Sequence, residues 1–111
     1  MKTNKLVRDN IPELIKNSGK EAKWVSVVKE QRIPALVDKL REEVDELVKA
    51  STSKDANEFL EEAADVYEVL LALVYQHGFI DADLDLKTKR KRREKGAFDK
   101  FIWLKSIETD G

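Results

Sequence analysis

The chain has 111 residues, of which 41% are apolar and 39% charged, a composition typical of one soluble domain rich in amphipathic helix. Its formal net charge of -1 gives no overall attraction to nucleic acid, and the absence of cysteine excludes disulfides and thiolate zinc sites. No apolar run resembles a signal peptide or a membrane span. We therefore expect a single domain over residues 1–111, located in the cytoplasm, with no membrane contact.

The first half of the chain predicts a short helix, a strand and a long helix. Residues 11–19 are expected to form the short helix, because Pro12 suits a first turn and Gly19 a helix end. Residues 23–28 are short and β-branched, which favours a strand. From Ile33 up to a break at residues 51–57, apolar residues recur at helical spacing.

The second half predicts two more helices and a second strand. One helix runs from Glu58 to a glycine cap at Gly78, and His77, the only histidine, is expected to serve that helix end rather than catalysis. A last helix is expected over residues 81–95, whose acidic start and basic end match the helix dipole. Residues 101–107 could pair with residues 23–28. The fold class is thus mainly α, with a small two-stranded β ribbon.

Two acidic residues in the helix from Glu58 lie where a core helix should be apolar. At the pitch of an α-helix, Glu62 falls inside the apolar stripe and Asp65 lies on the same flank, one turn along. A buried carboxylate is costly unless it is paired, neutralised or bound to a metal. Glu62 therefore points to a functional site.

The preceding helix carries a matching pair in "KLREEVDEL". Glu43 and Glu46 fall with Lys39 on the flank that borders its apolar stripe. If the two helices pack antiparallel, four carboxylates converge, and hard oxygen ligands select Mg²⁺, with Mn²⁺ also suitable. Such an ion neutralises phosphate oxygens and activates the attacking water. The alternative is that each Glu-x-x-Glu pair is only a solvated helix face.

A family resemblance rests on these motifs. "KLREEVDEL" followed by "EEAADVYEVLLAL" resembles the carboxylate signature of the MazG-like all-α nucleoside triphosphate pyrophosphohydrolases. The opening "KLVRDNIPELI" and the closing "KRREKGAF" are similar to its small, single-domain branch, predicted to act in nucleotide house-cleaning. The resemblance implies a helical bundle and magnesium-dependent hydrolysis of a nucleoside triphosphate to monophosphate and pyrophosphate. The related phosphoribosyl-ATP pyrophosphohydrolases share the carboxylates without the "LVRD" opening, which leaves their substrate as an alternative.

Carried over residue by residue, the resemblance makes Glu43, Glu46, Glu62 and Asp65 the metal ligands and catalytic residues. It also brings basic and polar residues to the nucleotide. These predicted substrate-binding residues are Lys39, Lys5, Arg8, Asp9, Lys91 and Lys95. For the "KLVRD" stretch, the alternative is that Asp9 or Asn10 caps a helix and Arg8 pairs on the surface.

Two functions from other classes also fit parts of the sequence. The basic run at residues 87–95 could bind nucleic acid, although it lacks interleaved aromatic residues, and we expect no nucleic-acid partner. The apolar stripes could instead belong to an interaction domain. Neither explains a carboxylate on the core stripe. Two long amphipathic helices in so short a chain also predict a homodimer or higher oligomer with a shared bundle.

Overall fold

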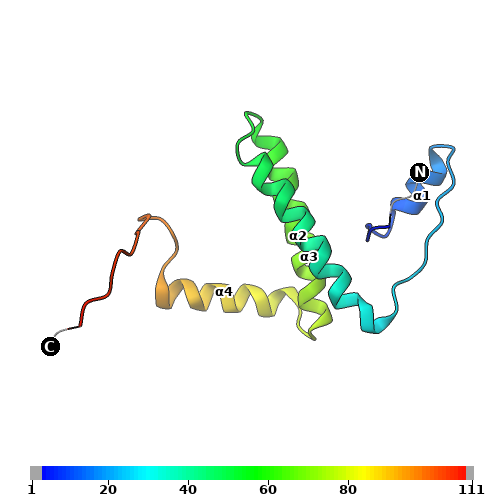
Figure 1. Cartoon of the computed structure of the whole chain (residues 1–111). Coiled ribbons are helices and arrows are strands. Elements are labelled where there is room, and N and C mark those ends of the chain that lie inside the picture. The colour runs from blue at the N-terminus through cyan, green and yellow to red at the C-terminus, as the bar shows by residue number, and fades with distance from the viewer. Residues whose placement is uncertain (1–3, 110–111) are drawn as a thin grey trace.

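The structure, a computed structural model, describes residues 4–109 as helices joined by irregular segments (Figure 1). In chain order these are α1 (Ile11–Asn17), the short 3-10 turn η1 (Lys29–Gln31), α2 (Arg32–Ala50), α3 (Ala56–Gln76) and α4 (Asp81–Lys95). The mainly α fold class is confirmed, and the helices begin and end close to the predicted positions. No helix within this described part is long and apolar enough to cross a membrane.

The predicted β ribbon is wrong. Neither residues 23–28 nor residues 101–107 form a strand. Figure 1 shows the two segments on opposite sides of the molecule, with the α2–α3 hairpin and α4 between them. A two-stranded ribbon is marginally stable even when its strands are adjacent. Here the path of the chain keeps them apart, so their β-branched and aromatic residues stay unpaired.

The centre of the fold is an antiparallel hairpin of α2 and α3, the arrangement on which the predicted meeting of carboxylates depends (Figure 1). Ala50, which ends α2, is 3% exposed and is the most deeply buried of the described residues. The connection is held by side chains: Asp55 caps α3 by accepting from the backbone N–H of Asn57 at 2.9 Å, and the Ser53 hydroxyl donates to Glu58 at 2.9 Å. These bonds fix where α3 begins opposite α2.

The other end of α3 turns the chain away from the hairpin. Gly78 has φ +87°, and the N–H of Phe79 donates to the carbonyl of Val74 at 3.1 Å, which is a Schellman cap. His77 Nδ1 lies 2.8 Å from the carbonyl oxygen of Leu73. His77 therefore serves the helix end, as its position in the sequence predicted. α4 then leaves the hairpin at a steep angle (Figure 1).

α4 is charged on all sides and stabilised locally. Asp83 accepts from the backbone N–H of Ile80 at 2.9 Å at its start, and ion pairs one turn apart follow, such as Lys89 with Asp85 at 2.9 Å. It leads into an irregular C-terminal segment. The whole molecule is accordingly elongated, with extents of 70 × 38 × 25 Å.

Candidate active site

Three carboxylates meet where α2 and α3 face each other. Glu43 from α2, with Glu62 and Asp65 from α3, each offer one oxygen, and these oxygens all lie within 4.8 Å of one another. All three residues are half-buried. The helical spacing places Glu62 and Asp65 on one flank, and the antiparallel hairpin brings Glu43 opposite them. We call Glu43, Glu62 and Asp65 the carboxylate cluster.

Glu62 is the member most affected by its surroundings. Burial raises the pKa of its carboxyl group above the ordinary value, and the negative charges of Asp65 and Glu43 raise it further. Glu46 and Glu58 act in the same direction. The charged form of Glu62 is therefore disfavoured, and a cation among these oxygens would remove the repulsion. This donor set of hard oxygens fits Mg²⁺ or Mn²⁺.

Glu46 does not join the cluster, although the sequence predicted it beside Glu43. Its Oε1 lies 3.6 Å from Nζ of Lys49, and half of its side-chain surface is exposed. Residues three apart on a helix differ by about 60° in direction, so one can face the partner helix while the other lies at its edge. Glu46 remains close enough to influence the pKa of Glu62, as an outer charge.

The N-terminal segment reaches the cluster through Arg8. Its Nη2 lies 2.6 Å from Oδ1 of Asp65, a contact between residues 57 positions apart. The alternative reading of "KLVRD" had Arg8 pairing on the surface, but it did not identify Asp65 as the partner. Asn10 stands at the start of α1 but makes no side-chain capping hydrogen bond. Arg8 thus ties the segment before α1 to the carboxylates, and Asp9, exposed beside it, is carried to the same region.

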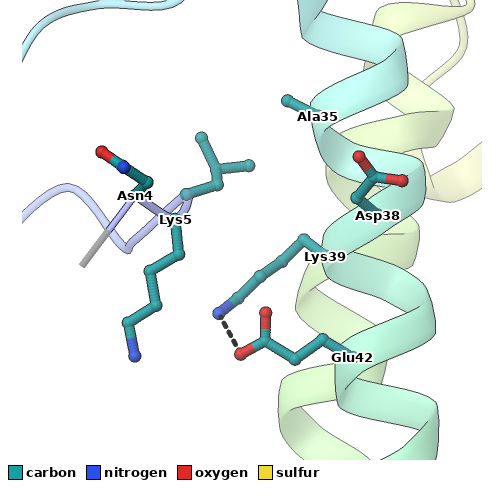
Figure 2. Close-up of a pocket in the computed structure, with 7 residues that line it drawn as sticks. Asn4, Lys5, Ala35, Asp38, Lys39 and Glu42 are labelled. Carbon is teal, nitrogen blue, oxygen red and sulfur yellow. Dashed lines mark hydrogen bonds and ion pairs between the residues drawn. The ribbon is translucent and has the colours of Figure 1, made fainter. Parts of the chain in front are cut away.

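Lys39 borders the cluster on the α2 side. Its Nζ lies 3.2 Å from Oε1 of Glu43 and 3.4 Å from Oε1 of Glu42, and its side chain is 17% exposed. Beside it is a pocket of about 190 Å³ between α2 and the N-terminal segment (Figure 2). The pocket is lined by Asn4, Lys5, Leu6, Ala35, Asp38, Lys39 and Glu42. Figure 2 shows Lys5 and Lys39 on opposite walls, so two cationic groups from distant parts of the chain share it.

The two predicted contacts on α4 are not brought to the cluster within one chain. Lys91 and Lys95 lie in the second half of α4, which leads away from the hairpin (Figure 1). Lys95 instead lines a second pocket, of about 450 Å³, together with residues 96–102. Any contact of these lysines with the carboxylates would need a second copy of the chain.

A comparison with known protein families gives one match. The model of the family described as PRA-PH, phosphoribosyl-ATP pyrophosphohydrolase, matches residues 13–89, more than half of the chain. That range holds the carboxylate cluster and Lys39 but not Arg8, Lys91 or Lys95. These pyrophosphohydrolases are part of the MazG-like all-α superfamily, so the resemblance found in the carboxylate motifs is confirmed. No curated protein and no solved structure matches the chain.

Proposed function

We propose that this chain, which belongs to the phosphoribosyl-ATP pyrophosphohydrolase family, hydrolyses a nucleoside triphosphate to the monophosphate and pyrophosphate with a divalent cation. The observation that carries the proposal is the meeting of Glu43, Glu62 and Asp65 within 4.8 Å. Three carboxylates at that spacing repel one another, and this repulsion adds to the effect of burial in raising the pKa of Glu62. Pyrophosphohydrolases of this superfamily generally use divalent metals.

The cluster residues would hold Mg²⁺, with Mn²⁺ as a substitute, and Glu46 would join as an outer ligand or as a charge that strengthens cation binding. When bound, the ion supplies charge neutralisation at the phosphate oxygens and activation of water. Basic side chains of the chain itself would bind the substrate. Lys39 and Lys5 face one pocket beside the cluster and would hold the phosphate groups there. Arg8 and Asp9 would close the site from the N-terminal side.

Our choice between two candidate substrates depends on the segment before α1. Phosphoribosyl-ATP, the substrate in the family's description, is the second candidate and contains the same α–β anhydride bond. We favour an ordinary or noncanonical nucleoside triphosphate because "KLVRD" lies outside the matched range and places Arg8 on Asp65. A triphosphate of this kind suits a role in cleaning the nucleotide pool.

The proposal includes self-association. On the outer side of the hairpin, Val48 of α2 and Leu60 and Tyr67 of α3 are more than half exposed. Leu60 and Tyr67 lie seven residues, or two helical turns, apart on one face of α3. A second copy of the chain would cover both faces. Light scattering should find a dimer or larger species at micromolar concentration; a monomer there would refute this part.

A nucleotide panel with magnesium tests the reaction. Canonical and noncanonical triphosphates and phosphoribosyl-ATP are incubated with the full chain, and pyrophosphate is measured separately from orthophosphate. We expect pyrophosphate as the first product, released from at least one triphosphate and lost in chelator. Orthophosphate as the primary product would contradict the bond assignment. Preference for phosphoribosyl-ATP over every triphosphate would move the substrate to the second candidate.

A further inference from the structure

The C-terminal segment, residues 98–107, is a strongly apolar and exposed stretch of the described chain. Six of its ten side chains are large and apolar, and each is between 70% and 89% exposed. They are Phe98, Phe101, Ile102, Trp103, Leu104 and Ile107. Contiguous apolar surface of this kind marks an interaction site. We call residues 98–107 the C-terminal arm.

The composition of the arm is not that of a disordered tail. Disordered segments are poor in aromatic and branched residues, because they cannot bury enough apolar surface to offset the entropy of ordering. The arm is rich in both. Within it, Phe101 has φ +49°, a left-handed conformation unusual for a bulky residue. Such a segment is expected to lie against another apolar surface.

The described residues of its own chain do not supply that surface. α4, with 15 residues and a length of roughly 22 Å, carries the arm away from the hairpin (Figure 1). α4 itself is charged on nearly every side, with Leu84 and Leu86 as its large apolar residues. A helix that is polar all round bridges solvent rather than building a core. The arm therefore needs a surface from outside the chain.

The dimensions of the whole molecule point to a second copy as that surface. A compact monomer of 12.8 kDa exposes roughly 6,300 Å², whereas this chain exposes 10549 Å². Its radius of gyration is 19.1 Å, against roughly 13 Å for a compact chain of this length. The excess, on the order of 4,000 Å² for one chain, exceeds the roughly 1,000–2,500 Å² that each chain buries in a typical obligate homodimer interface.

Charge is also complementary between α3 and the basic half of α4. α3 carries five acidic residues and no basic one, while residues 86–95 of α4 carry seven basic residues and one acidic residue. Two copies placed with α4 of one beside α3 of the other would attract each other. That placement would also lead the arm onto the apolar outer face of α3, where Leu60 and Tyr67 are exposed.

We propose that the C-terminal arm is exchanged between two copies of the chain, each arm covering the outer apolar face of α3 on the other copy. The exchange rests on the self-association proposed above and specifies its contacts. In it, α4 is a charged spacer, and the arm makes the apolar contact with the other copy. Aromatic residues are enriched in protein interfaces, and tryptophan is among the residues that contribute most to binding.

The first test follows the surroundings of Trp103. In a Trp24→Phe variant, Trp103 is the only indole, because the chain has two tryptophans. Its fluorescence emission and the sedimentation profile are recorded over a dilution series from about 100 µM to nanomolar. We expect blue-shifted emission in the dimer and a red shift that follows dissociation. Water-exposed emission in a sedimenting dimer would overturn the exchange.

The second test replaces aromatic residues of the C-terminal arm. Phe101→Ala with Trp103→Ala should raise the dimer dissociation constant by roughly 100-fold or more, the effect of losing two aromatic anchors. Ser106→Ala with Glu108→Ala, polar changes in and beside the same segment, is the matched control and should leave it unchanged. Circular dichroism monitors helix content, so that a failure to fold is recognised. A chain ending at Ala97 checks the result without relying on either substitution.

Two outcomes would refute the proposal in different ways. If the shortened chain forms a dimer as tightly as the full chain, the hairpin alone mediates association and the arm is free. If the full chain is a monomer and Trp103 shifts to the blue only when vesicles of anionic phospholipid are added, the basic half of α4 and the arm bind a membrane surface instead. Both results are independent of hydrolysis, and only the second also removes the proposed self-association.

Discussion

The α2–α3 hairpin and the region formed by α4 and the C-terminal arm use their residues in opposite ways. In the hairpin, apolar residues recur at helical spacing, two helices pack, and acidic residues near the seam become half-buried. In α4, charge surrounds the helix and its order comes from capping and from ion pairs one turn apart. The apolar residues that α4 lacks are concentrated in the arm that follows it.

We infer from this difference that the hairpin serves hydrolysis, whereas α4 and the arm serve substrate capture and self-association. Desolvation and nearby like charges both raise the pKa of a carboxyl group, and the hairpin provides both for Glu62. The charged residues of α4 stay solvated. Changes in the hairpin should therefore affect hydrolysis first, and changes in α4 or the arm should affect substrate capture or assembly first. The following predictions test that division, from the largest expected effect to the smallest.

Glu62→Gln should lower hydrolysis by roughly 100-fold or more, because even the loss of an outer partner of a metal ligand costs 10- to 100-fold. In chelator the same variant should melt at or above the wild type, since one repelling charge is gone. Magnesium should raise the melting temperature of the wild type and much less that of the variant. Glu61→Gln, an exposed neighbour with the same charge, is the control. Equal stabilisation of both proteins by magnesium would remove Glu62 from the site.

Glu43→Gln should lower hydrolysis nearly as much as Glu62→Gln, whereas Glu46→Gln should cost roughly tenfold or less, the lower range for an outer residue. The reason is that Glu43 belongs to the carboxylate cluster and Glu46 lies at its edge beside Lys49. Both variants are assayed over a magnesium titration. Should the two lose activity equally, Glu46 would be a direct ligand that moves inward when the cation binds.

Arg8→Ala should lower kcat/KM by roughly tenfold, the equivalent of one charge-assisted hydrogen bond. Stability should change by no more than about 1 kcal/mol, because both partners of the Arg8–Asp65 pair are substantially exposed. Arg41→Ala, which removes a similar pair with Asp38 at 3.7 Å, is the control. Unchanged kinetics for Arg8→Ala would limit the N-terminal segment to a structural role.

Lys91→Ala with Lys95→Ala should raise KM for the triphosphate by roughly fivefold and leave kcat near its wild-type value, because exposed charges steer an anionic substrate. Lys20→Ala with Lys23→Ala removes the same charge far from α4 and serves as control. If the first pair instead abolishes tight, salt-sensitive binding of duplex nucleic acid, the basic run is a nucleic-acid site.

The smallest effect concerns pH. Because the folded state raises the pKa of Glu62, the metal-free protein is favoured where that group is protonated and loses stability as pH rises through the raised value. Glu62→Gln lacks this dependence. The melting temperature of the variant relative to the wild type in chelator should therefore increase from about pH 4 to about pH 7. A constant difference would mean that Glu62 titrates as an ordinary surface carboxylate.

Much of the helical framework was predictable because its determinants are local. The spacing of apolar residues located α2 and α3, the acidic start and basic end located α4, and Gly78 marked the end of α3. Each signal acts within about four residues, the distance over which a helix makes its own hydrogen bonds. The prediction of two strands was wrong because a strand is stable only when it pairs with another strand, and composition alone does not provide that partner.

The sequence by itself determined that Glu62 and Asp65 share a flank and that Glu43 and Glu46 form a second pair, since the helical pitch fixes both. Only the tertiary structure decided that Glu43 faces α3 while Glu46 turns aside, because that depends on how far α2 is rotated about its axis. It also placed Arg8 on Asp65, 57 residues away, and directed α4 away from the hairpin. These arrangements depend on packing between segments that are distant in the sequence, and no local sequence pattern encodes that packing.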